Sequence, residues 1–61
     1  MKLIHQELGN NRRADIGTVL GKFNVVLYEN DEQVRIVEVH EHSEQYAHDV
    51  AENWINGIIK K

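Results

Sequence analysis

Apolar residues in the last third of the chain recur at three- and four-residue steps. An α-helix completes a turn every 3.6 residues, so this spacing places them on one face and leaves charged and amide side chains on the other. The pattern predicts one amphipathic helix over residues 43–57. Its apolar stripe consists of Ala47, Val50, Ala51, Trp54 and Ile58, flanked by Tyr46 and Ile55.

The residues at both ends of this segment are typical of helix boundaries. Ser43 suits the N-cap position because its hydroxyl can accept a hydrogen bond from a backbone N–H of the first turn. Gly57 can adopt the left-handed conformation that ends many helices, and Ile58 is then expected to pack back on the last turn. Lys60 and Lys61 would follow as a short basic tail, whose charge suits a helix C-terminus.

A short first strand is predicted at the N-terminus. Leu3, Ile4 and Leu8 lie in the run KLIHQEL, which is compatible with a strand of about six residues. Residues 9–11 are Gly-Asn-Asn, which tolerate positive φ, so the chain is expected to reverse there. The two arginines that follow would lie on the loop or at its edge.

A longer strand is predicted over residues 17–29. Its apolar residues occupy every second position on both sides of Gly21. This continuous alternation indicates a single strand bent or bulged at this glycine. The alternative makes Gly21 and Lys22 a two-residue type II′ turn and gives four short strands in all. We favour the single strand. The alternating apolar residues are Val19, Phe23, Val25 and Leu27.

The strongest hairpin signal is the Asn-Asp pair at 30–31, which separates two runs rich in β-branched and aromatic residues. Two registers are open. If only this pair forms the turn, Val25 faces Ile36. If Glu32 joins the loop, Val25 faces Val37 instead, and we favour this second register. A slip of one residue exchanges the two faces of a strand, so the register decides which residues meet the helix.

The favoured register sorts the apolar residues into two surfaces. One surface meets the helix and holds Phe23, Val25, Leu27, Val37 and Val39. The other holds Val26, Tyr28, Val34 and Ile36. One helix covers only one face of a small antiparallel sheet, so the second face needs another cover. The N-terminal segment or a second copy of the protein could supply it, and we predict a homodimer.

These elements predict an α+β fold, a three-stranded antiparallel β-meander with one C-terminal α-helix packed on one face. Residues 1–61 would form a single small β-β-β-α domain. A chain of this length buries only about 60% of its unfolded surface. It contains no Cys and therefore no disulfide, which favours oligomerisation as the additional source of stability.

Charge is unevenly distributed along the chain. The formal net charge is −3, but residues 1–27 carry four basic and two acidic groups, whereas residues 28–61 carry three basic and eight acidic groups. A net negative charge disfavours a general nucleic-acid binder, which needs a positive face for phosphate. The alternative function is nevertheless a small nucleic-acid-binding protein with a basic N-terminal patch of Lys2, Arg12, Arg13 and Lys22.

Three histidines near the strand-to-helix junction have the most evident ligand chemistry. His40 and His42 share one side of a strand end, and His48 follows on the helix. Imidazole suits Zn²⁺ or a similar ion, so these three residues are the candidate ligands of a metal site. Histidines at such a corner are more often solvated surface, and we therefore predict no metal and no cofactor.

Enzymatic activity is not expected. The chain has no Cys nucleophile, Ser43 is better used as a helix cap, and the sequence has no Gly-rich phosphate loop. It also has no apolar run of the roughly 18 residues that a membrane span needs, and its N-terminus is too weakly apolar for a signal peptide. We expect a cytoplasmic protein with no membrane partner.

One resemblance bears on function. The runs FNVVLYE and VRIVEVHE precede a capped helix with Ser43, Tyr46, Ala47, Asp49, Val50, Ala51, Glu52, Asn53, Trp54, Gly57 and Ile58. Over residues 23–59 the chain resembles small uncharacterised proteins encoded by phages of cyanobacteria. The resemblance implies an accessory protein in the cytoplasm of an infected bacterium. The order of strands and helix is also similar to the latter part of a double-stranded-RNA-binding domain, but the helix here is acidic where that domain is basic.

We therefore predict a non-enzymatic accessory protein that acts as a protein–protein interaction module. Its partner would be another protein, including a second copy of itself, bound through the uncovered face of the sheet. The predicted interface is formed by Val26, Tyr28, Val34 and Ile36.

Overall fold

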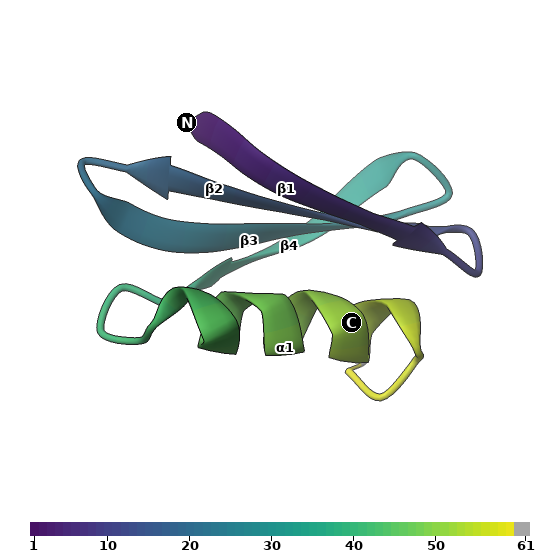
Figure 1. Cartoon of the computed structure of the whole chain (residues 1–61). Helices are drawn as coiled ribbons and strands as arrows, with labels where there is room; N and C mark the ends of the chain where they lie inside the picture. Colours follow the sequence, from purple (N-terminus) through teal and green to yellow (C-terminus); the bar gives the residue numbers. More distant parts are fainter. Residues whose placement is uncertain (60–61) are drawn as a thin grey trace.

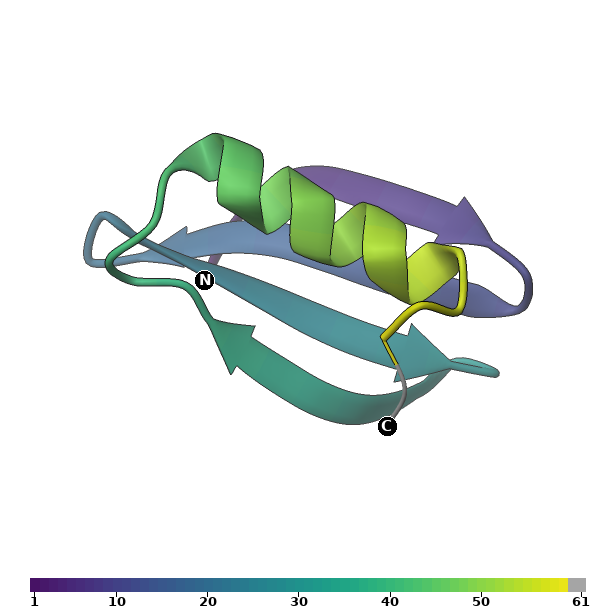
Figure 2. The ribbon, with the colours of Figure 1, turned by 90° about the horizontal axis from the view of Figure 1, so that it is seen from below.

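The computed structural model describes residues 1–59, which form four β-strands followed by one α-helix (Figure 1). The strands pair antiparallel in chain order, and the helix lies across one face of the sheet (Figure 2). The predicted α+β class and the C-terminal helix are confirmed, but the prediction of three strands is wrong. The elements are β1 (Lys2–Gly9), β2 (Arg12–Val19), β3 (Lys22–Glu29), β4 (Glu32–Glu38) and α1 (Glu44–Ile55).

The additional strand arises from a turn that the sequence pattern conceals. Leu20 and Gly21 both have positive φ, 54° and 77°, and form a two-residue turn between β2 and β3. The favoured single strand over residues 17–29 is therefore wrong, and the alternative turn at Gly21 and Lys22 lies one residue too late. Leucine rarely adopts positive φ, which is why residue 20 gave no turn signal.

The same turn geometry recurs along the sheet. Residues 10–11, 20–21 and 30–31 all have positive φ and each connects two neighbouring strands. Positive φ at both central residues is the feature of the type I′ turn, whose twist matches that of paired strands. Because the first turn contains only residues 10–11, Arg12 and Arg13 begin β2, at the edge of the loop and not on it.

The β3–β4 hairpin contains both of the registers that the sequence left open. Next to the turn, Glu29 pairs with Glu32, so Glu32 belongs to β4 and not to the loop. Farther along, Val25 pairs with Val37, as in the favoured register. The two registers meet at a β-bulge, where Val34 is the extra residue of β4.

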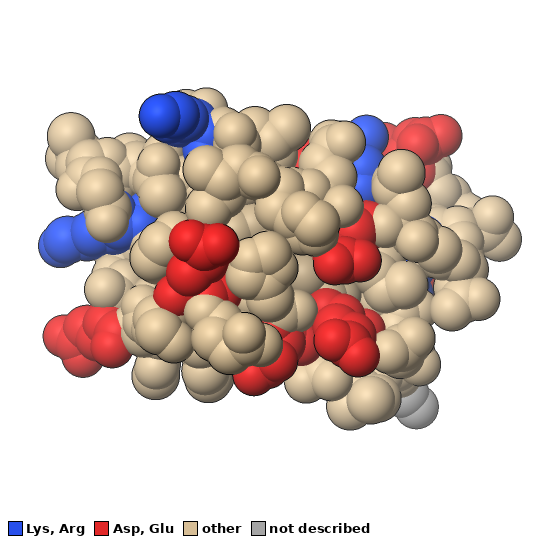
Figure 3. All heavy atoms as spheres, in the orientation of Figure 1, with Lys and Arg blue, Asp and Glu red and all other residues tan. Residues whose placement is uncertain are grey.

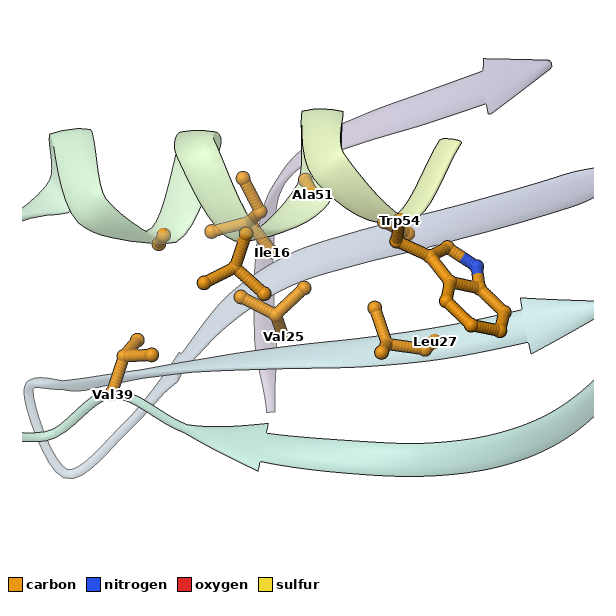
Figure 4. Close-up of a cluster of buried hydrophobic side chains, with 9 residues drawn as sticks. Ile16, Val25, Leu27, Val39, Ala51 and Trp54 are labelled. Carbon is orange, nitrogen blue, oxygen red and sulfur yellow. The ribbon is translucent and has the colours of Figure 1, made fainter. Parts of the chain in front are cut away.

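The hydrophobic core lies between α1 and the sheet (Figure 4). Trp54 is fully buried there, and its indole N–H donates a hydrogen bond of 2.9 Å to the carbonyl oxygen of Tyr28. β2 contributes Ala14 and Ile16, which the sequence analysis did not assign to the core. The remaining buried apolar residues of the cluster are Val25, Leu27, Val39, Ala47, Val50 and Ala51.

The ends of α1 match most of the predicted boundary features. Ser43 is the N-cap residue, although its side chain makes no capping hydrogen bond within the described residues. Gly57 has φ of +76°, and its N–H and that of Ile58 donate to carbonyl oxygens of the last turn, as in a Schellman motif. The Ile58 side chain is 69% exposed, so the expected packing of this residue is wrong, and Ile59 packs against the core instead. Lys60 and Lys61, the predicted basic tail, lie outside the described residues.

We expect Gly57→Ala to destabilise the fold by about 1–2 kcal/mol, the cost of holding an L-residue in the left-handed region. A Cβ at this position meets no atom within 4 Å, so the loss would come from the backbone alone. Gly57→Asn is the matched variant and should cost less, because Asn tolerates positive φ. Urea unfolding followed by circular dichroism measures both, and equal stability of Gly57→Ala and wild type would contradict the assignment.

Candidate interaction surface

The sheet face that points away from α1, here called the open face, contains three rows of paired residues. Arg13, Tyr28 and Gln33 form one row across β2, β3 and β4. Asp15, Val26 and Ile36 form the next, and Gly17, Asn24 and Glu38 form the third. Three of the four predicted interface residues, Val26, Tyr28 and Ile36, therefore lie on this face.

Val34 does not lie on the open face. The β-bulge moves it to the side of the sheet that faces the core, where it packs against the core cluster. Its assignment to the second apolar surface is therefore wrong, because that assignment assumed one continuous register for the hairpin.

The open face is hollowed along β3 and β4, from the β2–β3 turn at Leu20 to Tyr28 and Gln33. The hollow has a volume of about 590 Å³ and its lining is mainly apolar. Val26 lies in it and is nearly buried, whereas Ile36 is 52% exposed and Leu20, at the turn, is almost fully exposed. Lys22 and Glu38 add one charge of each sign to its lining. The hollow is thus an apolar surface bordered by opposite charges.

Three polar residues near Tyr28 on the open face, Arg13, Asp15 and Gln6, contact one another. The Arg13 guanidinium lies 3.9 Å from the centre of the Tyr28 ring, and its Nε is 3.2 Å from Oδ1 of Asp15. Gln6 donates from Nε2 to the same carboxylate oxygen. Asp15 is buried, which the sequence did not suggest, because β2 was not recognised as a strand. The Arg13 guanidinium thus packs on the ring of Tyr28, which lines the hollow.

The N-terminal segment does not cover the open face as a layer. β1 extends the same sheet, and Leu3 and Ile4 remain half-exposed on it. Only Met1 folds over the face, above Gly17, where a Cβ would lie 2.5 Å from the Met1 Cγ. Glycine at this position therefore gives Met1 room to contact the sheet.

The four candidate nucleic-acid residues do not form one patch. Arg13 belongs to the open face, whereas Arg12, its neighbour in β2, points to the helix side and contacts Trp54. Lys2 and Lys22 pair with residues 18 and 19, at the opposite end of β2. In the view of Figure 3, most acidic side chains gather over the half of the molecule where α1 lies.

The histidines of the strand-to-helix corner are also separated. His40 Nε2 lies 3.0 Å from Oδ1 of Asn24, and His42 stacks on Tyr46 at a ring distance of 3.9 Å. His48 lies instead beside two residues of β1 that the sequence analysis did not consider, His5 and Glu7. Over residues 1–59, the only group of three potential metal ligands is this one, and His40 and His42 are not part of it.

Comparison with protein-family models, with curated proteins and with solved structures found no match to this chain. No helix within the described part of the chain is long and apolar enough to cross a membrane.

Proposed function

We propose that this protein is a non-enzymatic interaction module that self-associates through the open face of its sheet. The observation that supports the proposal is the exposed apolar hollow on this face. α1 covers one face of the sheet, and an antiparallel sheet with apolar residues on both faces needs a second cover. Val26, Tyr28 and Ile36 would form the centre of the contact.

The mixed charges of the hollow favour a second copy of the chain as the occupant. A two-fold dimer brings each surface against itself, so a patch with both charge signs can pair Lys22 of one copy with Glu38 of the other. A standard interface buries about 800 Å² on each partner. The whole surface is 4101 Å², so such an interface would use about a fifth of it. With the phage resemblance, this would be a self-associating accessory protein of the bacterial cytoplasm.

The decisive experiment compares Ile36→Glu with wild type by sedimentation velocity over a range of concentrations. We expect a wild-type dimer and, for the variant, weakening by about 30-fold or more, because a buried carboxylate replaces a central apolar contact. Ile58→Glu is the matched control, since Ile58 is 69% exposed at the end of α1, away from the open face. A monomeric wild type at millimolar concentration, or an Ile36→Glu variant that dimerises like wild type, would refute the proposal.

A further inference from the structure

Two histidines and a glutamate from distant parts of the chain converge on the helix side of β1. The ligand atoms of His5, Glu7 and His48 all lie within 4.8 Å of one another. His5 and Glu7 are two residues apart on β1 and pair with Ile16 and Ala14, which lie under α1, so both side chains point toward the helix. His48 approaches them from the first half of α1.

The contacts within this cluster define its geometry. His5 Nε2 lies 2.8 Å from Oε1 of Glu7, and the centres of the His5 and His48 rings are 4.9 Å apart with an interplanar angle of 54°. Glu44, one turn before His48 in α1, places Oε2 3.2 Å from the His48 Nε2. The group therefore combines two imidazoles with two carboxylates.

We propose that His5, Glu7 and His48 bind a divalent transition-metal ion, with Zn²⁺ as the best fit. Imidazole and carboxylate are common ligands of Zn²⁺, which they bind at about 2.0–2.2 Å. Ligand atoms of a tetrahedral site at these bond lengths are about 3.4 Å apart, so rotation of the side chains brings the cluster to coordination distance. The carboxylates of Glu7 and Glu44 supply a charge that complements that of the ion.

The three proposed ligand side chains are also accessible to an ion from solution. The side chains of His5, Glu7 and His48 are each about a third to two fifths exposed. Three protein ligands leave the fourth tetrahedral position of the ion open to water. The bound ion would connect β1, an edge strand, to α1 and would close a loop of the chain from residue 5 to residue 48. Metal binding would thus strengthen the contact between the edge strand and the helix.

Titration calorimetry with ZnCl₂ on untagged protein tests this proposal, because a polyhistidine tag would itself bind the ion. We expect one equivalent of Zn²⁺ to bind and a rise in Tm of at least about 10 °C when the free metal concentration reaches a hundred times Kd. His5→Ala and His48→Ala should each weaken binding at least tenfold. His42→Ala is the matched control and should bind as wild type does, since His42 stacks on Tyr46 outside the cluster.

Nuclear magnetic resonance of wild type provides a second measurement that does not depend on the folding of the variants. Addition of Zn²⁺ should shift the ring signals of His5 and His48 and leave those of His42 unchanged. Absence of binding heat at millimolar Zn²⁺, or shifts confined to His40 and His42, would overturn the proposal. So would unaltered affinity in a folded His5→Ala, His48→Ala double variant.

Discussion

Replacement of Trp54 by alanine is expected to remove most of the stability of this protein. Deletion of a buried tryptophan side chain costs about 3–5 kcal/mol. A domain of 61 residues has about 3–9 kcal/mol in total, by the usual stability per residue. Trp54 is fully buried in the core, and its removal would also leave the Tyr28 carbonyl without the indole N–H donor. We therefore expect Trp54→Ala to be largely unfolded at 37 °C.

Trp54→Phe separates packing from hydrogen bonding. It keeps an aromatic ring in the core but lacks the N–H group, so its loss should be about 1–3 kcal/mol, the cost of an unsatisfied buried acceptor. Because Trp54 is the only tryptophan, unfolding must be followed by far-ultraviolet circular dichroism rather than fluorescence. The unfolding free energies of all variants must be compared at one protein concentration, since self-association would add to stability. A loss below about 1 kcal/mol in Trp54→Ala would contradict the assigned core.

The helix was predictable because its signals are local. The stripe of apolar residues and the glycine at its end depend only on spacing within about fifteen residues, and the structure places α1 at Glu44–Ile55 with Gly57 after it. The β3–β4 hairpin was recognised for the same reason. In both cases sequence neighbours supply the pattern, so long-range contacts were not needed to identify the element.

The predicted number of strands was wrong because long-range strand pairing overrides the local conformational preference of a residue. Leu20 adopts positive φ because the pairing of β2 with β3 requires a two-residue turn there, not because leucine favours it. The bulge at Val34 is similar, since it lets the turn residues and the core residues of the hairpin satisfy different registers. Gly21 indicated a turn, as in the four-strand alternative, but neither the positive φ of Leu20 nor the bulge at Val34 has a signal in the residues themselves.

The two candidate sites differed in how far the sequence could reveal them. Val26, Tyr28 and Ile36 were assigned to the open face from alternation and from the favoured register of the hairpin. The His5, Glu7 and His48 cluster depends on the pairing of β1 with β2, which brings β1 beside α1 (Figure 2). The spacing of His5 and Glu7 on one side of a strand was visible, but their approach to His48 was not, because β2 had not been recognised as a strand.

Arg12 shows how a residue chosen for its charge can instead hold the fold together. Its Nη1 donates to the carbonyl oxygens of Trp54 and Ile59 at 2.9 and 3.1 Å, near the C-terminal end of α1. Its Nε and Nη2 both lie 3.1 Å from Oε2 of Glu29, and its guanidinium lies 4.1 Å from the centre of a Trp54 ring. The last turn of α1 has no basic residue of its own within the described residues, so this arginine from β2 supplies the favourable positive charge.

We expect Arg12→Ala to destabilise the protein by about 2–4 kcal/mol, because charge-assisted hydrogen bonds contribute about 1.5–3 kcal/mol and the Arg12 side chain is only 17% exposed. Arg12→Lys keeps the charge but not the planar group that reaches both Glu29 and the helix, and it should recover less than half of the loss. Arg35→Ala, at an exposed position on β4, is the control and should stay within about 0.5 kcal/mol of wild type.

Amide hydrogen exchange distinguishes this role from a general loss of stability. If Arg12 anchors the end of α1, its removal should speed exchange of the amides of Gly57 and Ile58 more than that of amides in the β2–β3 pair. A uniform increase over the whole sheet would instead indicate global destabilisation without a local anchor. Unchanged stability and exchange in Arg12→Ala would leave Arg12 available for an electrostatic partner, and would restore it as a candidate for nucleic-acid binding.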